Sequence, residues 1–219
     1  SDVARYGVDI WMTTNAVTQN FRICQSNLGV KIHDAKDPAE HLGPMFRQVV
    51  WTIFSLMERF ETHWKGVRGS EQVEVFGYEG SVEPEPVKVD VEAMIQHFKI
   101  GFQQFSSLWK EIFCESCFAA IQEAAQAEAK AFFLPTGVWV RILYELAATF
   151  HAWKVNRNKL VDLMTPLYYA RVASFVRESW EMSSKEADSL VEKQALEFEE
   201  AKDYLVKVWD EKTTPQAPA

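Results

Sequence analysis

Apolar residues recur every three or four positions through most of this sequence, and this spacing predicts a chain built from helices. Since an α-helix has 3.6 residues per turn, the spacing gives each helix one apolar face. Two clear stripes are Phe46, Val49, Val50, Ile53, Leu56, Met57 and Phe60, and Met94, Phe98, Phe102, Phe105, Trp109 and Ile112. Such faces are buried against one another, so we expect a mainly α fold with a helical bundle-like C-terminal domain.

Local start and stop signals set the limits of the expected helices. Asp90 is suited to cap the N-terminus of a helix, and Ser183 with Glu186 forms the pattern of a capping box. Pro135 ends one helix and is compatible with the first turn of the next. The expected helices cover residues 8–20, 44–64, 91–112, 115–132, 136–154, 159–181 and 184–210.

The remaining segments differ in texture from the helices. Residues 28–32 read as a short strand that ends at His33, and residues 66–90 form a Gly- and Pro-containing loop in which residues 73–78 are a candidate hairpin. We therefore expect a small mixed α/β segment over residues 1–42, a helical domain over residues 43–212, and a disordered tail over residues 213–219.

Composition and charge exclude several classes of protein. The net charge is −8, whereas binding to nucleic-acid phosphates requires clustered Lys and Arg. Three cysteines make no disulfide framework, and no apolar run is long enough to span a membrane, so we expect a cytoplasmic protein. The chain starts without Met or a leader sequence, and we expect that it begins within a longer protein.

The main candidate functional residues lie in two segments near the start of the chain. The segment Tyr6-Gly7-Val8-Asp9-Ile10 offers a glycine turn followed by a helix that presents an acid. The later segment Leu28-Gly29-Val30-Lys31-Ile32-His33 offers an extended strand that delivers a histidine to its edge. Asp9 and His33 are therefore candidates to converge on one cleft.

These two segments, in this order, resemble the late part of the catalytic domain of GT-A-type glycosyltransferases. The group with the nearest motifs contains glucosyl-3-phosphoglycerate synthases and mannosylglycerate synthases. Leu42-Gly43-Pro44-Met45 is also similar to the Leu-Gly-x-Met that opens the next helix in that group. The resemblance covers about residues 6–47 and identifies residues 1–42 as a remnant of the catalytic domain.

The resemblance implies a function for each matched residue. It makes His33 a ligand of a divalent metal, Mg²⁺ or Mn²⁺, that bridges the phosphates of a nucleotide-sugar donor. It places Asp9, with Tyr6 and Gly7, in the sugar and acceptor pocket. Transfer of a hexosyl group to a small polar acceptor such as a hydroxy acid, with retention of configuration, is the implied reaction. Related transferases dimerise through C-terminal helices, which implies a homodimer here.

Two departures from the family pattern bear on this interpretation. The family takes its other metal ligands from an Asp-x-Asp, which this sequence lacks, so we expect it upstream and expect this chain alone to be inactive. Asp34 directly follows His33, which weakens the case for a phosphorylated acceptor. Lys31, Lys36 and Arg5 remain candidate contacts to an anionic group.

Structural explanations compete with each of these functions. His33 is also compatible with a surface histidine, and Asp9 with an acid that stabilises a helix N-terminus. The pair Cys114 and Cys117 has the spacing of a redox or metal pair, but without a second pair or a nearby histidine we interpret it as structural. The surplus of Trp and Phe also fits a helical oligomerisation or docking module without catalysis.

Overall fold

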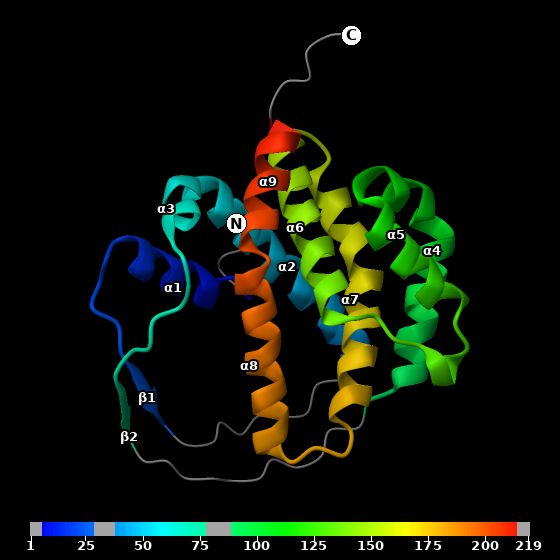
Figure 1. Ribbon diagram of the computed structural model, residues 1–219, viewed down its shortest axis with the longest axis horizontal. Coiled ribbons are helices and arrows are strands. Elements are labelled where there is room, and N and C mark those ends of the chain that lie inside the picture. Colours follow the sequence, from blue (N-terminus) through cyan, green and yellow to red (C-terminus); the bar gives the residue numbers. More distant parts are fainter. Residues whose placement is uncertain (1–5, 29–37, 78–88, 214–219) are drawn as a thin grey trace. The chain divides into compact units, whose positions relative to one another are not determined.

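The computed structural model describes residues 6–28, 38–77 and 89–213, and for residues 38–42 it describes the backbone alone. Contacts divide the chain into two compact units, Ser1–Lys88 and Val89–Ala219. Figure 1 shows the elements of both units. The described part is mainly helical, which confirms the expected fold class. The boundary expected after residue 42 separates residues proposed to belong to a catalytic domain from the helices that follow. It is a different kind of boundary from a division by contacts, and it stays a prediction.

The N-terminal unit is built on one long amphipathic helix. In helix α2 (Pro38–Arg59), Val50 and Leu56 of the expected stripe are buried, and so are Thr52 and Phe54, which lie outside it. Helix α1 (Val8–Thr18) packs against α2, and the short helix α3 (Glu61–Gly66) follows α2 directly. The expected continuous helix over residues 44–64 is interrupted at Phe60. The Trp64 indole N–H donates to the Met57 carbonyl at 2.9 Å, which holds α3 back against the end of α2.

The N-terminal unit also contains two short strands that lie far apart in sequence. Strands β1 (Gln25–Asn27) and β2 (Val75–Gly77) pair in parallel, with Ser26 opposite Phe76. The expectation of a hairpin over residues 73–78 was therefore wrong. A hairpin needs two extended arms and a reversal within one segment. Here the two paired strands are separated in the sequence by α2, because β1 precedes that helix and β2 follows it. Of the strand expected at residues 28–32, only Leu28 lies within the described residues, and it follows β1.

Six α-helices and a short 3-10 helix form the described part of the C-terminal unit. They are α4 (Val91–Ile112), α5 (Glu115–Gln126), η2 (Ala129–Ala131), α6 (Thr136–Ala152), α7 (Arg157–Ser179), α8 (Ser184–Glu200) and α9 (Lys202–Thr213). Helix α4 packs along α7, and α6 packs along α9, while α5 lies against α4 and α6 (Figure 1). The expected helix over residues 115–132 ends earlier, at Gln126.

The cap signals read from the sequence are confirmed. The Asp90 carboxylate accepts from the Ala93 backbone N–H at 2.9 Å. Ser183 and Glu186 form a complete capping box at the start of α8. The single helix expected over residues 184–210 is instead divided at Ala201 into α8 and α9. Only α9 buries side chains, because its Leu205, Val208 and Trp209 pack into the core while α8 buries none.

The core of the C-terminal unit is dense in aromatic and aliphatic side chains. Its largest fully buried members include Trp109, Trp209, Phe98, Phe132 and Phe150. Within the described ranges, no helix combines the length and the apolar character needed to cross a lipid bilayer.

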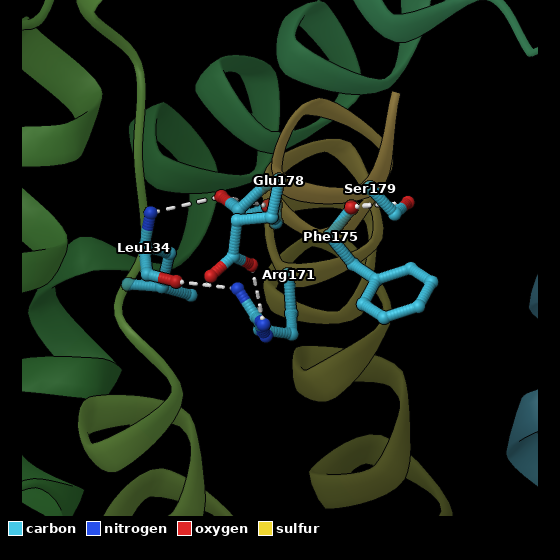
Figure 2. Close-up of polar contacts among 7 residues, drawn as sticks. Leu134, Arg171, Phe175, Glu178 and Ser179 are labelled. Atoms are coloured by element: carbon cyan, nitrogen blue, oxygen red, sulfur yellow. Dashed lines mark hydrogen bonds and ion pairs between the residues drawn. The ribbon is translucent and has the colours of Figure 1, made fainter. Parts of the chain in front are cut away.

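Helix α7 also clamps the segment that precedes α6 (Figure 2). The Leu134 carbonyl accepts from the Arg171 guanidinium at 3.0 Å, and its backbone N–H donates to the Ser174 hydroxyl at 2.8 Å. The Arg177 guanidinium donates to the Phe132 carbonyl at 3.1 Å. These bonds satisfy backbone groups that have no partner within a helix, so the extended link between η2 and α6 is held against α7.

Gly101 permits the close crossing of α4 and α7, and its replacement by alanine is expected to be destabilising. A Cβ at Gly101 would lie 2.3 Å from Cβ and 2.4 Å from Cγ of Pro166, whose ring cannot rotate away. We expect Gly101→Ala to lower the free energy of unfolding by about 1–3 kcal/mol through overpacking, although alanine is intrinsically the better helix former by about 1 kcal/mol.

Gly137 is the matched control for this prediction, because a Cβ there would meet only Glu197 Oε2, at 3.5 Å. Urea unfolding followed by circular dichroism compares the two variants. If Gly101→Ala were as stable as Gly137→Ala or more stable than the wild type, the close contact between Gly101 and Pro166 would be contradicted.

Candidate functional site

The predicted site residues fall into two groups. Tyr6, Gly7 and Asp9 are described by the structure, at the start of α1. The candidates Arg5, Lys31, His33 and Lys36 lie outside the described residues.

The Tyr-Gly pair ties the start of α1 to α2. The Tyr6 backbone N–H donates to Gln48 Oε1 at 3.4 Å. Gly7 is buried, and a Cβ there would lie 2.2 Å from Thr52 Oγ1. The glycine of the motif therefore has a packing function, because a larger residue would push α1 away from Thr52.

Asp9 lies in the first turn of α1 with its side chain exposed. An acid at this position interacts favourably with the helix dipole, and its carboxylate is also accessible to a hydroxylated ligand. Among the described residues, Asp9 belongs to no group of three His, Cys, Asp or Glu side chains close enough to share an ion. The described part of the motif therefore does not form a metal site by itself.

A second polar cluster lies inside the C-terminal unit, around the carboxylate of Glu145. Glu145 is in the middle of α6 and only 2% exposed. Its Oε2 accepts from the Cys114 backbone N–H at 2.7 Å, and its Oε1 accepts a short hydrogen bond from the Tyr204 hydroxyl. The carboxylate thus connects the N-terminus of α5 with α6 and α9.

Both cysteines of the Cys-x-x-Cys segment lie beside Glu145. Cys114 is the N-cap residue of α5 and is half-buried, and Cys117, in the first turn, is buried. One ligand atom from each of Cys114, Cys117 and Glu145 lies within 4.8 Å of the others. The Cys114 thiol also contacts the Ser116 hydroxyl at 3.3 Å.

Burial governs the ionisation of this cluster. Desolvation raises the pKa of the Cys117 thiol far above its ordinary value, and its hydrogen bond with Cys114 and the charge of Glu145 raise it further. Desolvation likewise raises the pKa of Tyr204, reinforced by its hydrogen bond to Glu145. At neutral pH Cys117 is therefore a thiol, and Tyr204 is a neutral phenol that donates to the carboxylate.

Cationic groups lie close to the same cluster. Lys212 donates from Nζ to the Ile112 carbonyl at 2.9 Å and to Thr149 Oγ1 at 3.0 Å. Desolvation lowers the pKa of Lys212, and the charge of Glu145 opposes that shift. The Arg141 guanidinium lies 5.1 Å from the centre of the Tyr204 ring. Lys212 also lines a pocket of about 600 Å³ between α4, α6 and α9.

Sequence reasoning identified the cysteine pair but missed its carboxylate partner. The available signal was Glu145 itself, an acid that lies near the apolar residues Ile142 and Leu146 on the buried face of its helix. Tyr204 and Lys212 carry no such signal, because they reach the cluster only through the packing of α9 on α6.

The chain was compared with protein-family models, curated proteins and solved structures. No protein-family model, curated protein or solved structure gives a significant match to this chain.

Proposed function

We propose that this chain is the C-terminal part of a metal-dependent glycosyltransferase that moves a hexosyl group from a nucleotide-sugar to a small polar acceptor such as a hydroxy acid. The observation that carries the proposal is the order of three motifs: Tyr6–Ile10, Leu28–His33 and Leu42–Met45. In this proposal residues 1–42 form the acceptor side of the catalytic domain, and the helices that follow form a C-terminal helical domain.

The described residues support the proposal in two respects. Gly7 is buried against Thr52, which gives a physical reason for a glycine at this position of the motif. Asp9 is exposed at the first turn of α1, so its carboxylate is accessible to accept hydrogen bonds from sugar or acceptor hydroxyls.

Each remaining motif residue has a proposed function. His33 provides one metal ligand, and an Asp-x-Asp upstream of this chain provides the others. A Mg²⁺ or Mn²⁺ ion bound there supplies Lewis-acid stabilisation of the leaving diphosphate. Lys31, Lys36 and Arg5 provide positive charge to an anionic acceptor or to the phosphates. The three cysteines are free thiols, which favours a reducing compartment such as the cytoplasm.

Substitution of His33 tests the proposal in a protein that contains these residues preceded by the proposed nucleotide-binding half. We expect His33→Ala to reduce Mn²⁺-dependent transfer from UDP-glucose or GDP-mannose by about 100-fold or more, because loss of a direct ligand costs at least as much as loss of an outer-shell partner, for which about 10- to 100-fold is typical. The matched control is His63→Ala, since His63 lies in α3 outside the motifs. Equal activity of the two variants, or no metal-dependent transfer by the unmodified protein, would contradict the proposal.

A helical docking or oligomerisation module is the second candidate function. Large apolar side chains are exposed around α8 and its entry, including Trp180 at 70%, Leu196 at 56% and Val191 at 52%. A contact between two copies would remove this area from water. Light scattering over a range of protein concentrations tests the idea, and a monomer at every concentration would count against it.

A further inference from the structure

We infer that Cys114, Cys117 and Glu145 form a binding site for a thiophilic divalent cation of the zinc class. This site lies in the C-terminal unit and shares no residue with the proposed Mg²⁺ or Mn²⁺ site of the glycosyltransferase motif. Its ligand atoms, two sulfurs and one carboxylate oxygen, lie within 4.8 Å of one another.

The donor set selects the class of ion. Two thiolates and a carboxylate suit Zn²⁺, which is bound by sulfur and oxygen ligands in a tetrahedral arrangement. Mg²⁺ and Ca²⁺ prefer sites made of oxygen atoms alone, so they compete poorly for two sulfurs. Three protein ligands leave the fourth position to a water molecule.

The carboxylate ligand is held in place by neighbouring groups. The Cys114 backbone N–H and the Tyr204 hydroxyl donate to different oxygens of Glu145. A carboxylate has about four lone-pair sites, so these two bonds leave acceptor capacity for an ion. Hydrogen bonds of this kind orient ligands in metal sites. Cys114 is only half-buried, which gives an ion a route from solvent to the buried Cys117 and Glu145.

The charges around the cluster are compatible with a bound cation. Binding of Zn²⁺ to two thiols and a carboxylate releases two protons, and the resulting site carries a net charge of about −1. Lys212 interacts electrostatically with Glu145 and Cys114, and Arg141 interacts with Cys117. These two cations offset the residual negative charge. The bound ion would then connect the N-terminus of α5 directly to α6.

Cobalt titration of the reduced full chain tests the site. With a phosphine reductant present, we expect Co²⁺ to bind in a 1:1 ratio and to give a sulfur-to-cobalt charge-transfer band that Zn²⁺ abolishes. Mg²⁺ in large excess should leave the band unchanged. Cys114→Ser and Cys117→Ser should each weaken binding by about 100-fold or more, since each removes a ligand. Glu145→Gln should weaken it similarly if that variant folds, as judged by circular dichroism.

The third cysteine provides the matched control. Cys24 is exposed and lies in the N-terminal unit, so Cys24→Ser should retain the cobalt band and the affinity of the wild type. His33→Ala should also bind Co²⁺ normally, which separates this inference from the proposed transferase function. Absence of the band in the reduced protein, or its survival in Cys114→Ser and Cys117→Ser, overturns the inference. If the protein as purified contains a disulfide between Cys114 and Cys117 and binds no Co²⁺ after that disulfide is reduced, the inference is also overturned, and the two cysteines are a redox pair.

Discussion

Replacing Trp109 with alanine is expected to lower the free energy of unfolding by about 3–5 kcal/mol, the range for truncation of a large buried aromatic. Trp109 is 0% exposed, and its ring packs against Phe98, with ring centres 6.4 Å apart, and against Phe102. Its indole N–H donates to the Leu163 carbonyl at 3.2 Å, within helix α7. The substitution therefore opens a cavity and removes a hydrogen bond where α4 meets α7.

Trp180→Ala is the control for this substitution, because Trp180 is 70% exposed. Its effect should stay within about 0.5 kcal/mol, as for other surface changes. Trp109→Phe retains most of the ring but removes the N–H, so we expect an intermediate loss of stability. Urea unfolding of the three variants provides the free energies of unfolding. An unchanged urea midpoint for Trp109→Ala would contradict the burial of Trp109 between α4 and α7.

The second large effect is expected at Arg171, which clamps the link before α6 (Figure 2). Arg171 is 4% exposed, and its guanidinium donates to the Leu134 carbonyl at 3.0 Å and to Glu178 Oε2 at 2.7 Å. Arg171→Ala leaves both acceptors without this donor. We expect a loss of about 3 kcal/mol, the lower end of the range for a broken buried pair, because the Glu178 side chain is 25% exposed and stays partly hydrated.

Two further variants separate geometry from charge at this clamp. Arg171→Lys retains the positive charge but lacks the forked donor that reaches both acceptors, so it should be destabilised by an intermediate amount. Lys207→Ala breaks an exposed pair with Glu211, at 3.8 Å, and should change stability by less than about 1 kcal/mol. Thermal and urea unfolding measure the series. Equal stabilities for Arg171→Ala and Lys207→Ala would contradict a buried clamp.

Helices and their caps were predictable because they depend on nearby residues. The bond between Asp90 and Ala93 and the capping box of Ser183 and Glu186 each span three residues. The stripe of α4 was also predicted, and its Met94, Phe98, Trp109 and Ile112 are buried. The breaks at Phe60 and Ala201 were missed, since neither residue is a proline or glycine, the two residues that mark helix ends most clearly in a sequence.

The candidate sites were predictable only where a motif is contiguous. Tyr6, Gly7 and Asp9 were identified as candidates because they belong to one short segment, and the structure adds the packing of Gly7 against Thr52. Cys114 and Cys117 were recognised by their spacing and interpreted as structural. The presence of Glu145 beside them gives the pair a third donor atom that its spacing did not indicate.

By itself the sequence determined a mainly helical chain, the positions of most helix starts, and the ordered motifs on which the transferase proposal rests. These properties follow from contacts three or four residues apart and from local residue order. Only the tertiary structure decided that β1 pairs with β2, that Arg171 binds the Leu134 carbonyl, and that Glu145 meets Cys114 and Tyr204. Each of these contacts joins residues more than 30 positions apart, so it depends on how the intervening elements are arranged in space and not on neighbouring residues in the sequence.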